Sequence, residues 1–179
     1  MESPRLPTFD SEVERAMARW PDVPQCFDWL GLDRRGAWRI RGDAISHART
    51  VAFLGRHYRA DAQGRWYVQN GPQQVFVALE YTPWIYRFDP QAGFTTHTGL
   101  TANDILTVCA DDEGNLLIET GLGVGLVDDR DLVACATTIA WHGEQAVGFA
   151  WQGHDLPVIR LARAAVAARW GFVQQPSAA

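Results

Sequence analysis

Short stretches in which apolar and polar residues alternate run through most of the chain, and they predict β-strands. Successive side chains of a strand point to opposite faces of its sheet, so this alternation gives each strand one apolar face. The expected strands cover residues 26–32, 37–41, 65–69, 74–80, 84–88, 105–110, 115–119, 124–127, 132–140 and 146–151. Glycine and aspartate separate these segments at positions that favour tight turns. The pattern therefore predicts a protein built mainly of antiparallel hairpins.

Three other segments repeat apolar residues every three or four positions, which predicts helices. These helices are expected over residues 12–20, 46–58 and 156–170. Ser11 and Glu14 form a capping-box pattern at the first helix, and Ser46 is the expected N-cap of the second. Asp155 is expected to cap the third helix and Gly171 to end it.

A pattern of aspartate, glycine and a large apolar residue, Asp-x-x-Gly-x-apolar, occurs three times, beginning at Asp33, Asp61 and Asp111. The segment GRWYVQNG after Asp61 also aligns with the segment GNLLIETG after Asp111, fifty positions later. Two interpretations stay open: an internal duplication, or separate hairpins that share the same kind of turn.

These elements together predict an α+β fold made of duplicated, curved antiparallel β-sheets with associated helices. We expect residues 1–24 to form an N-terminal helix and linker, and residues 25–92 to form a first β-rich repeat. A second β-rich repeat with the C-terminal helix is expected over residues 93–173, followed by a disordered tail over residues 174–179.

The composition indicates a globular protein of the cytoplasm. Apolar residues make up 47% of the 179 residues, and eight tryptophans with eight phenylalanines supply ample core material. A net charge of −5 gives no indication of a nucleic-acid partner. No apolar run approaches the roughly 20 residues needed to span a bilayer, the N-terminus lacks the apolar segment of a signal peptide, and the three cysteines are far apart. We therefore expect reduced thiols, no membrane association and a cytoplasmic location.

The chain contains no lysine, because all 16 basic residues are arginine. This excludes Schiff-base chemistry, pyridoxal-phosphate attachment and a P-loop. The glycine-rich run at 121–125 precedes no helix pattern, and the acidic clusters at 111–113 and 128–131 lack the spacing of a calcium loop. The five histidines show no metal-binding spacing. We therefore expect no catalytic residues, no metal site and no cofactor, and the sequence favours a binding protein over an enzyme.

The most distinctive stretch, QNGPQQVFVALEYTPW at residues 69–84, combines a turn with a strand that ends in polar and aromatic residues. Amide side chains give directional hydrogen bonds, an aromatic ring gives a stacking surface, and an arginine neutralises an anionic group. The candidate ligand-binding residues are Asn70, Gln73, Glu80, Tyr81, Trp84 and Arg87. The open alternative is a turn and a strand end without a ligand.

The segment WPDVPQCFDWLGLDRRGAWRIRGDAI at residues 20–45, with the stretch just described, resembles an uncharacterised proteobacterial family of conserved hypothetical proteins. More distantly, the layout resembles a second family of unknown function, through Trp38, Gly42 and Ile45, the segment 64–72, and the signature at residues 80–84. Here NGPQQ replaces the threonine-proline-acidic motif of that family. That resemblance implies a duplicated β-rich fold with a second half like a pleckstrin-homology barrel, a small ligand of the nucleotide type between the two domains, and a signalling role.

The leading hypothesis is a small-ligand-binding or regulatory protein, with its site between the two halves and a nucleotide-type molecule as one candidate ligand. The first alternative is a hydrolase-type enzyme that uses dispersed carboxylates, namely Glu80 with Asp128 or Asp129. The second alternative is a protein–protein interaction module. The sequence identifies no protein partner and no oligomeric state.

Overall fold

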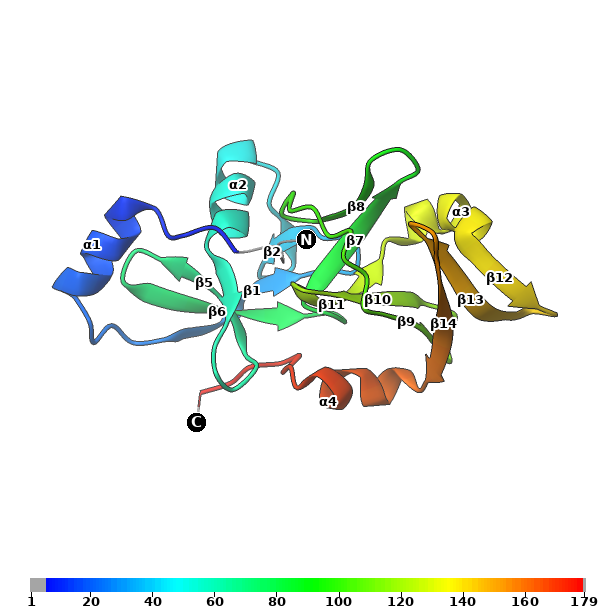
Figure 1. Cartoon of the computed structure of the whole chain (residues 1–179). Helices are drawn as coiled ribbons and strands as arrows, with labels where there is room; N and C mark the ends of the chain where they lie inside the picture. The colour runs from blue at the N-terminus through cyan, green and yellow to red at the C-terminus, as the bar shows by residue number, and fades with distance from the viewer. Residues whose placement is uncertain (1–5, 179) are drawn as a thin grey trace. The chain divides into compact units, whose positions relative to one another are not determined.

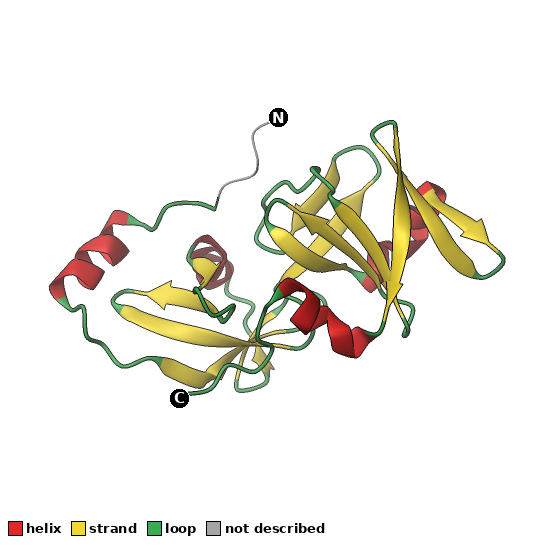
Figure 2. Ribbon diagram, turned by 60° about the horizontal axis from the view of Figure 1, so that its bottom comes forward, coloured by secondary structure: helices red, strands yellow, loops and turns green. Residues whose placement is uncertain are grey.

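The computed structural model of the protein describes residues 6–178, and its contacts divide the chain into two units. The first unit comprises residues 6–83 with 171–178, and the second comprises residues 84–170. The boundary between the two units lies between residues 83 and 84, whereas the boundary expected between the two repeats lies between residues 92 and 93. Strands dominate both units and the helices are short (Figure 1, Figure 2), which confirms the predicted mixed α+β class with two curled sheets. No helix within residues 6–178 is long and apolar enough to cross a bilayer.

The first unit contains a six-stranded sheet in the order β3-β2-β1-β6-β5-β4. Neighbouring strands are antiparallel except for β1 and β6, which are parallel. The strands are β1 Cys26–Leu32, β2 Trp38–Ile40, β3 Asp43–Ala44, β4 Tyr58–Ala60, β5 Trp66–Asn70 and β6 Gln73–Leu79, and the helices are α1 Ser11–Arg19 and α2 Ala48–Arg56.

Both faces of this sheet carry buried side chains, and α2 lies beside one of these faces (Figure 1). Tyr58 packs edge-on against Trp38, with 5.1 Å between the ring centroids, and its hydroxyl donates a hydrogen bond to the Pro83 carbonyl oxygen. The N-cap of α2 is His47 rather than Ser46, because the His47 ring accepts the hydrogen bond from the Thr50 amide.

Residues 171–178 return to the first unit after the second unit is complete. The Val173 amide donates to the Gly64 carbonyl oxygen at 2.9 Å, and the Leu79 amide donates to the Gln174 carbonyl oxygen at 2.7 Å. Phe172 is buried. Gln174, the first residue of the tail expected to be disordered, is thus hydrogen-bonded to the sheet, while residue 179 and residues 1–5 of the expected N-terminal segment lie outside the described residues.

The second unit contains an eight-stranded sheet in the order β12-β13-β14-β9-β10-β11-β7-β8. Its parallel pairs are β7 with β11 and β9 with β14. The strands are β7 Trp84–Asp89, β8 Gly93–Thr96, β9 Thr107–Asp111, β10 Leu116–Thr120, β11 Gly123–Val127, β12 Ile139–His142, β13 Gln145–Trp151 and β14 His154–Leu161, and the helices are α3 Leu132–Cys135 and α4 Val166–Trp170.

The two units share one order of strands. In the first unit a hairpin, β1–β2, is followed by a three-stranded meander, β4–β5–β6, whose last strand pairs in parallel with β1. In the second unit the hairpin β7–β8 and the meander β9–β10–β11 repeat this arrangement, with β11 parallel to β7. An internal duplication would give this correspondence, and both the duplication and the likeness to a pleckstrin-homology barrel stay predictions.

Two predicted elements are wrong. Residues 132–140 were expected to form a strand, but the Asp128 carboxylate accepts the Arg130 amide and starts a helical segment that continues through α3 to residue 138. Residues 156–170 were expected to form a helix, but residues 154–161 form β14, which is paired on both sides, with β13 and β9. A 3₁₀ turn at Arg163–Ala165 and the short helix α4 remain of that helix, which ends as predicted at Gly171, whose φ is +66°.

Candidate functional site

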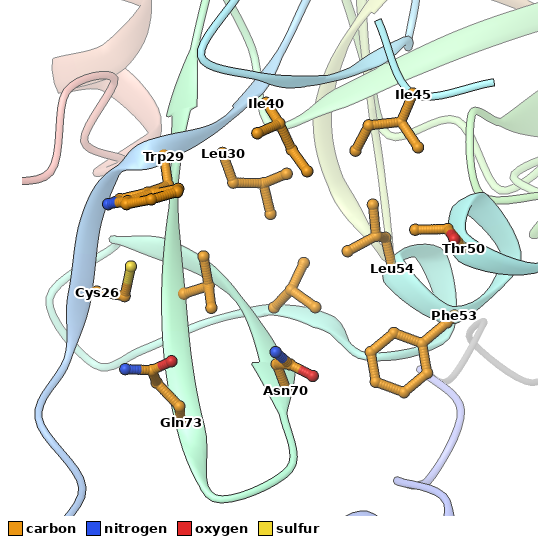
Figure 3. Close-up of a pocket in the computed structure, with 12 residues that line it drawn as sticks. Cys26, Trp29, Leu30, Ile40, Ile45, Thr50, Phe53, Leu54, Asn70 and Gln73 are labelled. Carbon is orange, nitrogen blue, oxygen red and sulfur yellow. The ribbon is translucent and has the colours of Figure 1, made fainter. Parts of the chain in front are cut away.

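A cavity of about 440 Å³ lies in the first unit, between the sheet and α2. No residue of α2 is fully buried, so the apolar face of this helix only partly covers the sheet. The cavity is the space left between this helix and the sheet (Figure 3). Its walls come from β1, β2, α2, β5, β6 and the segment before α2, and they consist of Cys26, Trp29, Leu30, Ile40, Ile45, Thr50, Phe53, Leu54, Val68, Asn70, Gln73 and Val75.

A β-bulge in β1 shapes one wall of this cavity. Cys26 pairs with Val75 and Leu30 with Val77, so the segment of β1 between them is two residues longer than the matching segment of β6. Asp28, within this bulge, has a φ of +64°. In a regular strand two neighbouring residues point to opposite faces. Here the bulge turns both Trp29 and Leu30 to the cavity.

Two contacts from Arg41, the residue after β2, hold Trp29 in place. The Arg41 amide donates to the Trp29 carbonyl oxygen at 3.0 Å, and the Arg41 guanidinium lies 3.7 Å from the centre of the indole ring. Arg41 has a φ of +49°. Among the described residues only three that are not glycine have a positive φ, and two of them, Asp28 and Arg41, flank this side chain. Such backbone costs on the order of 1–3 kcal/mol per residue and often accompanies a binding site.

The polar groups of the cavity gather at the turn between β5 and β6. Figure 3 shows the amides of Asn70 and Gln73 at this end, and Ile40 and Ile45 at the other. The Gln73 amide nitrogen donates to the Pro24 carbonyl oxygen at 3.0 Å, while the Asn70 side chain forms no hydrogen bond with the residues described. The lining contains no charged side chain. This arrangement suits a neutral molecule with an apolar body and one polar end.

The structure brings two of the six predicted site residues, Asn70 and Gln73, to this cavity. Glu80 and Tyr81 follow the other end of β6, a strand of seven residues and thus roughly 20 Å long. The Glu80 carboxylate accepts the Arg34 amide at 3.3 Å and lines a separate, shallower depression. Tyr81 is only 2% exposed, so its ring has no free face for stacking.

The other two predicted site residues, Trp84 and Arg87, belong to the second unit. Trp84 is buried, and its indole nitrogen donates to the Leu122 carbonyl oxygen at 2.8 Å. Arg87 forms an ion pair with Asp131, with 2.6 Å between Nε and Oδ2, and this hydrogen bond lowers the pKa of the Asp131 carboxyl group. Within their unit both side chains thus have structural partners.

The aromatic and aliphatic walls of the cavity, above all Trp29 with Phe53 and Leu54 of α2, were missed by reasoning from the sequence. One signal was present: Trp29 and Leu30 are adjacent apolar residues between Asp28 and Gly31, and such a break in the alternation is one sign of a bulge. The contribution of α2 carried no such signal, because its apolar face resembles that of any packed helix.

Asp128, one of the carboxylates of the enzyme hypothesis, serves a structural purpose in the second unit. Burial raises the pKa of Asp128, but hydrogen bonds from the side chain and backbone of Arg130 outweigh it, so this pKa lies below its ordinary value. A carboxyl group held ionised in this way is a poor general acid. Within residues 6–178 no three His, Cys, Asp or Glu side chains are grouped to hold a metal ion.

Comparisons with known proteins place this fold among families of unknown function. The chain is similar to a solved DUF1285 family protein from Silicibacter pomeroyi DSS-3, with 15% identity, a TM-score of 0.54, and coverage of 77% of this chain and 84% of that one. A DUF1285 family protein from Shewanella baltica OS155 matches with 12% identity and a TM-score of 0.45, over 60% of this chain and 90% of that one. The likeness to the first of these structures shows the fold alone.

A search of curated proteins finds no match. The sequence profile of the family DUF2944, described as "Protein of unknown function (DUF2946)", matches residues 9–177, which is nearly the whole chain. The chain therefore belongs to this family of proteins of unknown function.

Proposed function

We propose that this protein binds a small, neutral, largely apolar molecule in the cavity between the first sheet and α2. The observation that carries the proposal is the lining itself: apolar side chains on all walls, two amides at one end, and no charge. The volume of about 440 Å³ falls in the range of roughly 300–1,000 Å³ that is typical of small-molecule sites. The protein would act as a binding or regulatory component rather than as an enzyme.

A nucleotide does not suit this cavity. A buried phosphate needs arginine side chains or a group of backbone amides, since burying an unpaired charge costs far more than burying a neutral group. Arg39 and Arg41 line the neighbouring depression rather than the cavity, and Arg39 already pairs with Asp33 at 2.8 Å. The ligand we propose therefore differs in charge from the nucleotide-type molecule that the sequence suggested.

The test uses two fluorescent probes that differ by one charged group. N-phenyl-1-naphthylamine is neutral, and 8-anilinonaphthalene-1-sulfonate carries a sulfonate on nearly the same skeleton. We expect the neutral probe to bind with one-to-one stoichiometry and at least about tenfold more tightly than the sulfonate, because the cavity offers the charge no partner.

A cavity-filling variant and a matched control locate the binding. Leu54→Trp introduces a larger side chain into the lining, whereas Leu106→Trp makes the same change at a position that is 61% exposed and belongs to the second unit. We expect Leu54→Trp to abolish binding of the neutral probe and Leu106→Trp to leave it unchanged. Equal binding by wild type and Leu54→Trp, or tighter binding of the sulfonate, would rule the proposal out.

A further inference from the structure

We propose that the ligand of this cavity carries a planar aromatic ring that stacks on the indole of Trp29. This inference rests on the proposed function, because it specifies the chemical class of the molecule that the cavity binds. It depends on which face of the indole is free, how firmly the ring is held, and what polar groups stand near it.

One face of the indole is already occupied. The Arg41 guanidinium lies 3.7 Å from the ring centre, which is stacking distance. Arg41 does not line the cavity, although Trp29 does, and both line the neighbouring depression. The guanidinium therefore covers the face on the side of the depression. Figure 3 shows the indole edge-on, with one face toward Cys26, which lines the cavity.

The second face is thus a flat apolar surface that residues 6–178 leave uncovered, and Trp29 is 48% exposed. The bulge at Asp28 turns Trp29 to this position, and the Arg41 amide and guanidinium fix its backbone and its ring. A ring held in place before binding loses little conformational freedom when a ligand stacks on it. The strained backbone at Asp28 and Arg41 contributes to this orientation of Trp29, and such strain is common at binding sites.

The surroundings also select the kind of ring. A cationic ligand would be repelled by the Arg41 guanidinium behind the indole, and the cavity offers no carboxylate to attract it. An anionic ring would lack a partner for its charge inside the cavity. The amides of Asn70 and Gln73 can bond a hydroxyl or carbonyl group. A neutral aromatic molecule with one such polar substituent meets all of these conditions.

The test compares two alcohols that share a carbon skeleton and differ in aromaticity, naphthalen-2-ol and decahydronaphthalen-2-ol, by isothermal titration calorimetry. Aromatic pairs gain about 0.5–1.5 kcal/mol beyond the burial of their surface, which corresponds to roughly two- to tenfold in affinity. For each protein we take the ratio of the affinity for the aromatic alcohol to the affinity for the saturated one. We expect this ratio to be larger in the wild type than in Trp29→Leu by about this factor.

Two further variants make the comparison specific. Trp29→Phe keeps an aromatic ring and should retain most of the preference. Trp20→Leu removes a tryptophan that is 52% exposed and does not line the cavity, and it should leave the ratio unchanged. If both alcohols bind and the ratio is the same in wild type and Trp29→Leu, the stacking inference is overturned while the cavity stands. If neither alcohol binds, the proposed function fails as well.

Discussion

At the scale of single residues, three aspartates build the same turn in three places. The Oδ1 atoms of Asp33, Asp61 and Asp111 each accept hydrogen bonds from the backbone amides two and four positions later, at 2.8–3.0 Å. In each turn the amide of the following glycine also donates to the aspartate carbonyl oxygen. The repeated sequence pattern thus reflects one local structure, because this turn needs a short acceptor at its first position and a residue with positive φ at its fourth.

Asp33 should make the stability of the protein depend on pH. Burial raises the pKa of Asp33, but the amides of Ala37 and Arg35 and the guanidinium of Arg39 outweigh it, so this pKa is lowered on folding. A lowered pKa contributes stability above the unfolded value of about 3.9, and this contribution is lost as the pH falls through the folded value. We expect Asp33→Asn to be less stable than wild type by about 1 kcal/mol at pH 7, and this difference to shrink below pH 4. Urea denaturation across this range would show a constant difference if the reasoning is wrong.

Cys26 should be the one cysteine that reacts in the folded protein. Cys109 and Cys135 are buried, and burial raises the pKa of both thiols, that of Cys135 to about 12, whereas Cys26 is half-buried and lines the cavity. Neutral N-ethylmaleimide, followed by mass spectrometry, should therefore add one label quickly in buffer and three in denaturant. Free N-phenyl-1-naphthylamine at ten times its Kd should slow the first label about tenfold, since only unoccupied protein reacts. Rapid labelling of two or three thiols in buffer would contradict this expectation.

At the scale of elements, the same turn has different tolerance in the two units. Gly64 and Gly114 occupy equivalent positions with φ values of +75° and +83°. A Cβ atom on Gly64 would lie 1.9 Å from the Gly171 carbonyl oxygen, whereas a Cβ on Gly114 would meet nothing within 4 Å. The docked C-terminal segment, and not the turn, makes the difference.

Alanine substitutions separate backbone strain from this steric clash. Gly114→Ala should cost only the strain of a positive φ, about 1 kcal/mol. Gly64→Ala should cost about 1–3 kcal/mol more, because the chain must shift or release residues 171–173. Chemical denaturation followed by tryptophan emission measures the loss of stability in both variants. Equal losses of stability would show that residues 171–173 move away from position 64 at no cost in free energy.

Most elements were predicted well, and strand pairing decided one of the two exceptions. Apart from the two elements corrected above, each expected strand and helix matches the structure to within two residues at either end. The wrong helix prediction over residues 156–170 relied on Asp155 as a cap and on Pro157 in a first turn, both of which are also compatible with a strand. Pairing with β9 and β13 decides for the strand, and β9 lies more than forty residues earlier in the chain.

At the scale of the whole molecule, the chain leaves the first unit at residue 83 and returns to it at residue 171. The returning segment contributes the buried Phe172 and the hydrogen bonds of Val173 and Gln174. Loss of a buried phenylalanine alone typically costs about 3–5 kcal/mol. The first unit therefore depends for its stability on residues that follow the second unit in the chain.

Truncation after Trp170 tests this dependence. We expect it to lower the free energy of opening, measured by hydrogen exchange of the backbone amides in β4, β5 and β6, by at least about 3 kcal/mol. The amides of β9, β10 and β11 in the second unit should stay protected. Truncation after Pro176, which keeps the docked residues, serves as the control and should change neither. Full protection of the first meander without residues 171–179 would contradict the role assigned to the segment.

The sequence alone determined the features that depend on neighbours along the chain: the alternation of the strands, the first two helices, the aspartate turns and the helix stop at Gly171. It also placed Asn70 and Gln73 in a candidate site, because amides beside a turn are a local signal. Only the tertiary structure decided that β14 is a strand, that residues 172–174 pack on the first sheet, and that Trp29, Phe53 and Leu54 meet around one cavity. These outcomes depend on contacts between distant segments, whose free energy exceeds local preference and leaves no trace in a short window of sequence.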